Sequence, residues 1–145
     1  MYFGSIAQTV STSSVTLICA YAGWKGGRAE RWGAAMTFAA WMITPLAQNH
    51  HDLHKAQFGV LVVDLLYCAS LLALALRSSK FWPLWAAGFY LLEVLMHVDM
   101  LVDTQVKARA YFVGMEIFSY LSLFALGYGA WRESPRLCPA APVSP

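Results

Sequence analysis

Residues 55–76 read KAQFGVLVVDLLYCASLLALAL, and the polar run Arg77-Ser78-Ser79-Lys80 follows them at once. A helix that crosses a lipid bilayer needs about 20 mostly apolar residues. This segment has that length, and Asp64 is the one acidic side chain within it. The segment therefore predicts a transmembrane helix that ends at the polar run.

The composition of the whole chain agrees with a membrane setting. Of its 145 residues, 59% are hydrophobic and only 12% are charged. A soluble domain carries roughly 25% charged residues. This composition excludes a disordered chain, a disulfide-stapled secreted module and almost any free soluble enzyme.

Four further segments complete a predicted bundle of five transmembrane helices. The spans are about 4–23, 32–48, 55–76, 81–102 and 110–131. Short connections favour antiparallel neighbours, so we expect an all-α integral membrane protein with a single domain over residues 1–131. Pro45 predicts a kink or an early stop in the second span. Residues 132–145 contain four prolines and predict a disordered cytoplasmic tail.

The first segment allows two interpretations. Its Ser and Thr residues make it polar for a helix that faces lipid, although hydroxyls can be satisfied against a neighbouring helix. We expect it to span the membrane. A bundle of four helices is the alternative, if this segment is re-entrant or is cleaved as a signal peptide.

Loop charges predict the orientation of the bundle. One side carries seven cations, which are Lys25, Arg28, Arg31, Arg77, Lys80, Arg132 and Arg136. The other side carries three, Lys55, Lys107 and Arg109. Because cytoplasmic loops are enriched in Lys and Arg, the N-terminus should lie outside and the C-terminus in the cytoplasm. The Lys and Arg residues are scattered among short connections and form no basic stripe, which argues against a nucleic-acid partner.

All four histidines fall on the predicted outer side. His50, His51 and His54 lie in one connection, and His97 lies near the outer end of the fourth span. If the connection folds towards that end, the four imidazoles would converge on a metal ion or a haem. The alternative is a hydrated turn at the membrane surface that happens to be rich in polar residues.

Three carboxyl groups lie deeper in the spans, and each has a tyrosine one helical turn away. The pairs are Asp64 with Tyr67, Glu93 with Tyr90, and Glu116 with Tyr120. Residues three or four apart share one face of a helix. These pairs would therefore satisfy each other by hydrogen bonds and need no further function.

The same acids also support a functional interpretation, because charged groups in a membrane interior are costly and usually have a role. Glu93 and His97 share one face of the fourth span, and Glu116 lies at a similar depth on the fifth. A stripe of Asp64, Glu93, Glu116 and His97 would carry protons, hold a cation or bind a quinone head group. The sequence leaves these three ligands open.

Two segments carry a resemblance to a known group of proteins. They are Val63–Ser78 and Phe81–Gly88, within a resemblance that covers about Gly59 to Trp131. This part of the chain resembles small uncharacterised membrane proteins of bacteria. The resemblance implies a bacterial inner membrane and assigns no activity, and the histidine-rich connection lies outside it.

Two classes of function follow from these patterns. The first is a non-enzymatic accessory subunit or small-ligand binder, whose partners are the bilayer and other membrane subunits or further copies of the chain. No phosphate-binding loop, nucleophile elbow or complete metal motif occurs in the sequence. The second class is a metal-, haem- or quinone-binding or proton-coupled protein that uses the outer histidines and the buried acids.

Overall fold

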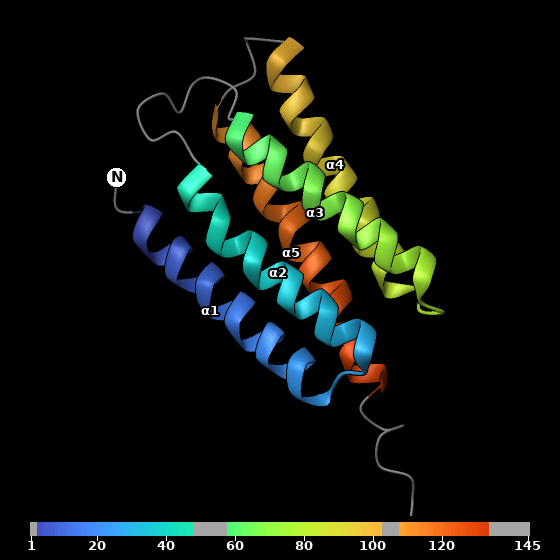
Figure 1. Ribbon diagram of the computed structural model, residues 1–145. Coiled ribbons are helices and arrows are strands. Elements are labelled where there is room, and N and C mark those ends of the chain that lie inside the picture. The colour runs from blue at the N-terminus through green and yellow to red at the C-terminus, as the bar shows by residue number, and fades with distance from the viewer. Residues whose placement is uncertain (1–2, 48–57, 103–107, 134–145) are drawn as a thin grey trace, which may run out of the picture.

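A computed structural model describes residues 3–47, 58–102 and 108–133, and this part of the chain forms five α-helices with no strands (Figure 1). The helices are α1 (Phe3–Lys25), α2 (Arg28–Ala47), α3 (Phe58–Arg77), α4 (Trp82–Val102) and α5 (Ala108–Glu133). The all-helical prediction is confirmed. Each helix coincides with one predicted span to within about four residues at either end.

Local sequence explains where several helices begin and end. Gly26 and Gly27 separate α1 from α2, and the polar run after α3 closes that helix. Pro83 is the second residue of α4, where a missing N–H costs no hydrogen bond. Pro45 lies within the last turn of α2, and the helix continues to Ala47. The kink or early stop predicted near Pro45 stays a prediction, since the described helix runs two residues past it.

The helices pack as a ring in chain order, and consecutive helices run in opposite directions (Figure 1). Each helix contacts the next one along the chain, and α5 closes the ring against α1. The last helix α5 also contacts α2. The predicted antiparallel order is present, and α2 and α5 each pack against three other helices.

The hydropathy of the helices supports two membrane spans. Among the described residues, only α3 (Phe58–Arg77) and the Ala110–Glu133 part of α5 are long and apolar enough to cross a membrane. The five-span bundle is therefore not confirmed. Polar side chains explain the difference, because α1 carries many hydroxyls, α2 begins with three charged residues and α4 contains Glu93, His97 and Asp99.

The core includes a tryptophan from the start of α4. Trp82 is buried, and its indole N–H donates a hydrogen bond of 2.8 Å to Oε1 of Glu30. Its ring packs against Gly33 and Gly129, which have no side chains to obstruct it. A Cβ on either glycine would come within 2.4 Å of the ring. Glu30 lies outside the predicted 32–48 span, whereas the structure places it in the first turn of α2. Four other tryptophans, Trp24, Trp32, Trp85 and Trp131, are exposed.

Candidate functional site

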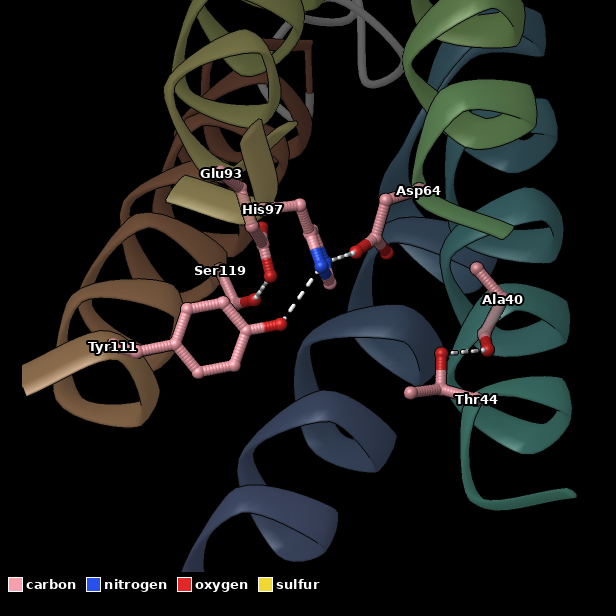
Figure 2. A network of polar contacts seen from close by, with 7 residues as sticks. All are labelled: Ala40, Thr44, Asp64, Glu93, His97, Tyr111 and Ser119. Carbon is pink, nitrogen blue, oxygen red and sulfur yellow. Dashed lines mark hydrogen bonds and ion pairs between the residues drawn. The ribbon is translucent and has the colours of Figure 1, made fainter. Parts of the chain in front are cut away.

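The most deeply buried polar contact joins three helices around His97. Its Nε2 lies 2.9 Å from Oδ2 of Asp64 on α3, and its Nδ1 lies 2.7 Å from the hydroxyl of Tyr111 on α5 (Figure 2). His97 and Tyr111 are each only 1% exposed, and Asp64 is 4% exposed. The imidazole therefore bridges a carboxyl group and a phenol away from solvent.

Helix geometry explains why these three side chains meet. Asp64 lies in the second turn of α3, His97 near the end of α4 and Tyr111 in the first turn of α5. Because neighbouring helices are antiparallel, the start of α3, the end of α4 and the start of α5 lie at the same end of the bundle (Figure 1). The edge of the Tyr111 ring also packs against the imidazole, with centroids 5.4 Å apart.

The two hydrogen bonds fix the chemistry open to His97. A neutral imidazole has one N–H donor and one acceptor nitrogen. If the Tyr111 hydroxyl donates a hydrogen bond to Nδ1, then Nε2 carries the imidazole proton. Nε2 in turn donates a hydrogen bond to Oδ2 of Asp64. Both ring nitrogens are engaged in this arrangement. A metal ion would have to displace one of these partners, so His97 is poorly placed as a ligand.

Glu93 forms a second polar contact one turn away on α4. Ser119 of α5 donates a hydrogen bond of 2.8 Å to Oε1 of Glu93 (Figure 2). The other oxygen, Oε2, is buried and has no hydrogen-bond partner in the described part of the chain. An unsatisfied buried acceptor of this kind is uncommon in proteins. Glu93 thus has unused capacity to accept a hydrogen bond.

The tyrosines do not bond the acids predicted for them within α3 and α4. The hydroxyl of Tyr67 lies 2.6 Å from Oγ1 of Thr37 on α2, whereas Asp64 bonds His97. Tyr90 packs against Tyr67 edge to face, with ring centroids 4.4 Å apart. These acids and tyrosines thus contact partners on other helices. The packed bundle places those partners closer than the residues one turn away on the same helix.

Glu116 and Tyr120 lie in a separate polar contact between α5 and α1. Ser11 donates to Oε1 of Glu116 at 3.3 Å, and its hydroxyl is 2.6 Å from that of Tyr120. Glu116 is exposed. The predicted stripe of four groups therefore divides into three contacts, one around His97, one at Glu93 and one at Glu116.

The predicted histidine cluster falls mostly outside the described residues. His50, His51 and His54 lie in the 48–57 segment, which the structure does not describe. Within the described helices, no group of three or more His, Cys, Asp or Glu side chains is placed to hold a metal ion. The metal and haem hypotheses thus stay predictions that rest on the sequence alone.

Sequence reasoning missed several members of these contacts. Tyr111, Ser119 and Ser11 each bond a predicted site residue, yet none was singled out. Glu30 is 1% exposed and was assigned to a connection. Its position three residues after Gly27 was the available signal, because acidic residues favour the first turn of a helix.

The chain matches no protein-family model, no curated protein and no solved structure. The resemblance to small bacterial membrane proteins therefore stays a prediction.

Proposed function

We propose that the protein is a small integral membrane protein that acts as an accessory subunit or small-ligand binder and not as an enzyme. The observation that carries this proposal is the apolar surface of the bundle. Large hydrophobic side chains are exposed on all five helices. A soluble monomer rarely exposes large contiguous apolar patches.

The exposed side chains are large and numerous even where polar groups interrupt a helix. On α4, whose interior carries Glu93 and His97, the exposed set is Leu84, Trp85, Leu91, Leu92, Leu95, Val98 and Val102. Glu93 and His97 thus face the inside of the bundle, while many of the large apolar side chains of α4 face outward. This arrangement supports a lipid-facing surface on α4, although α4 is not one of the two described helices that are long and apolar enough to be identified as membrane spans.

Two further features support an orientation in the bilayer. The exposed tryptophans Trp24, Trp32, Trp85 and Trp131 lie at the end of the bundle where α1 meets α2 and α3 meets α4. Tryptophan is enriched at membrane interfaces, and cytoplasmic loops are rich in cations. The same end carries six cations of the described helices and turns. We place this end in the cytoplasm, with the N-terminus outside, in a bacterial inner membrane.

The polar contacts support a structural role for most buried polar groups. Hydrogen bonds between side chains hold membrane helices together, with typical contributions of about 0.6 kcal/mol and up to about 2 kcal/mol each. The contacts at Glu116 and Tyr67 join neighbouring helices in this way. They account for these side chains without a substrate.

Fractionation of cells tests the proposal. The protein should stay with membranes after alkaline carbonate, and purification in mild detergent should yield a colourless protein that brings a larger membrane complex or a second copy with it. Release by carbonate would overturn membrane insertion. A haem absorption band or stoichiometric metal would favour the second class of function instead.

The bond chain Asp64–His97–Tyr111 favours a second candidate, a proton-coupled membrane protein. An imidazole can accept a proton on one nitrogen while it releases a proton from the other. His97 has an acidic group at each nitrogen, at 2.9 Å and 2.7 Å. The geometry therefore meets the distance requirement for proton transfer through hydrogen bonds.

Proteoliposomes that contain a pH-sensitive dye test this candidate. With a potassium gradient and valinomycin to drive protons, the protein should acidify the lumen faster than empty vesicles. Tyr111→Phe removes one hydroxyl and should abolish this flux. Tyr128→Phe is the matched control, because Tyr128 is exposed and should leave the flux unchanged. Equal flux with and without the protein would reject the candidate.

A further inference from the structure

A cleft opens at the end of the bundle that we place in the cytoplasm. Its volume is about 370 Å³, and residues from the α1–α2 turn, the α3–α4 turn and the end of α5 line it. The lining side chains that matter here are Arg28, Glu30, Arg77, Ser78, Lys80 and Glu133. The cleft is thus lined by charged groups at the end of an otherwise apolar bundle.

Two cations of the cleft are available to a ligand. Arg28 and Arg77 are exposed and form no ion pair with the described residues. Lys80 is different, because it pairs with Glu133 across the same cleft. Guanidinium groups present several N–H donors in a plane and suit phosphate oxygens better than an ammonium does. Arg28 and Arg77 therefore provide the chemistry of a phosphate site.

Two buried polar atoms of the cleft lack partners. Oε2 of Glu30 and Oγ of Ser78 are both buried and have no hydrogen-bond partner within the described helices and turns. Oε2 of Glu30 lies beside Gly27, another residue of the cleft, since a Cβ on Gly27 would lie 3.0 Å from it. Ser78 can donate to a phosphate oxygen, whereas Glu30 can accept from an N–H or O–H.

We propose that this cleft binds a phosphate-bearing group that also carries a hydrogen-bond donor, such as the ethanolamine or glycerol head group of a phospholipid. Arg28, Arg77 and Ser78 hold the phosphate, and Glu30 accepts from the ammonium or hydroxyl group. A choline head group has no N–H or O–H and should bind less well. The lipid source rests on the proposed membrane insertion, because the exposed tryptophans Trp32 and Trp85 then lie at head-group depth.

Native mass spectrometry of the full chain in detergent tests the proposal. The probes are phosphatidylethanolamine, phosphatidylglycerol and phosphatidylcholine with identical acyl chains, and inorganic phosphate alone. We expect the first two lipids to bind about tenfold more tightly than the choline lipid, which corresponds to about 1.4 kcal/mol. The double variant Arg28→Gln/Arg77→Gln should lose about tenfold in affinity for both preferred lipids.

A matched double variant keeps the experiment specific. Arg31→Gln/Arg132→Gln removes two exposed cations from the same end of the bundle, but neither residue lines the cleft. It should bind as the parent does. Glu30→Gln should retain phosphate binding and weaken the preference for the ethanolamine lipid, because the amide keeps an acceptor oxygen but loses the charge that attracts an ammonium group. Equal losses in the two double variants would overturn the proposal, because they would show attraction by overall charge alone.

The remaining outcomes separate the ligand source from the membrane proposal. Inorganic phosphate that displaces the lipids would support the site and assign it to a soluble phosphate compound. No binding of any probe would overturn the site. Vesicle flotation of the same samples measures insertion independently. A protein that floats with vesicles but binds no probe contradicts only the cleft, and one that binds phosphate without floating contradicts only the membrane proposal.

Discussion

His97 is held by two partners from two different helices, so its loss would leave both of them buried and unpaired. We expect His97→Ala to lower the free energy of unfolding by about 1–3 kcal/mol, the usual cost of an unsatisfied buried group. Unfolding in detergent, followed by circular dichroism, measures this change. Val98→Ala is the matched control, because Val98 is the exposed neighbour on the same helix. Equal effects of the two variants would contradict the role given to His97.

Substitutions at Glu93 and its partner test whether the buried carboxyl group lowers the stability of the fold. Ser119→Ala removes the hydrogen bond to Oε1 and should destabilise the protein by about 1–3 kcal/mol, because both oxygens of Glu93 are then unpaired. The double variant Glu93→Leu/Ser119→Ala removes both polar partners and should recover most of that loss. The measurement is the same detergent unfolding curve.

Ser70→Ala serves as the control for the serine change, since Ser70 bonds only a carbonyl of its own helix. It should alter stability by less than half as much as Ser119→Ala. If the double variant is less stable than Ser119→Ala alone, the idea that Glu93 is a net cost to folding is wrong.

At the scale of the elements, the packing of Trp82 between α2 and α5 depends on glycine residues in those two helices. A Cβ on Gly129 would lie 2.4 Å from Cδ1 of Trp82, close to the tryptophan backbone, where the ring has little freedom to move. Gly129→Ala should therefore destabilise the protein by about 1–3 kcal/mol through overpacking. Thermal unfolding in detergent gives the value.

Gly88 on α4 supplies a control with the opposite sign. Nothing lies within 4 Å of a Cβ at this position. Gly88→Ala should stabilise the helix by about 0.5–1 kcal/mol, because alanine loses less backbone entropy than glycine. A Gly129→Ala variant as stable as the parent would mean that α5 shifts freely against Trp82.

The elements were largely predictable from sequence, whereas their contacts were not. Apolar runs with polar ends predicted all five helices, because those features are local. Asp64 and His97 were placed in one predicted stripe, but Tyr67 was also offered as the partner of Asp64, and the structure pairs Asp64 with His97. The spacing of residues along one helix does not determine how that helix is rotated, or shifted along its axis, relative to its neighbour. The Glu30–Trp82 contact was missed for the same reason.

The whole molecule should place the two ends of α4 on opposite sides of the membrane. Replacement of the native cysteines Cys19, Cys68 and Cys138 by alanine gives a background without thiols. Ser79→Cys, in the turn before α4, should react with a membrane-impermeant maleimide only after the cells are opened. Asp99→Cys should react in intact cells. Both positions are exposed.

The labelling result bears directly on the span that hydropathy leaves open. Reaction of both cysteines from the same side would show that α4 does not cross the bilayer. Reaction with the two sides exchanged would keep the span and reverse the proposed orientation. Labelling of Ser79→Cys in intact cells would mean that the cleft at Arg28 and Arg77 no longer belongs to the cytoplasmic leaflet.

The side-chain bonds that α5 makes with earlier helices have a consequence for biosynthesis. Ser11, Glu93 and His97 all bond side chains of α5, and Lys80 pairs with Glu133 at its end. Because a ribosome makes α5 after the other four described helices, the polar groups of those helices lack their α5 partners at first. The five helices can pack fully only after α5 has been made, and until then the insertion machinery or a chaperone would need to protect these polar groups.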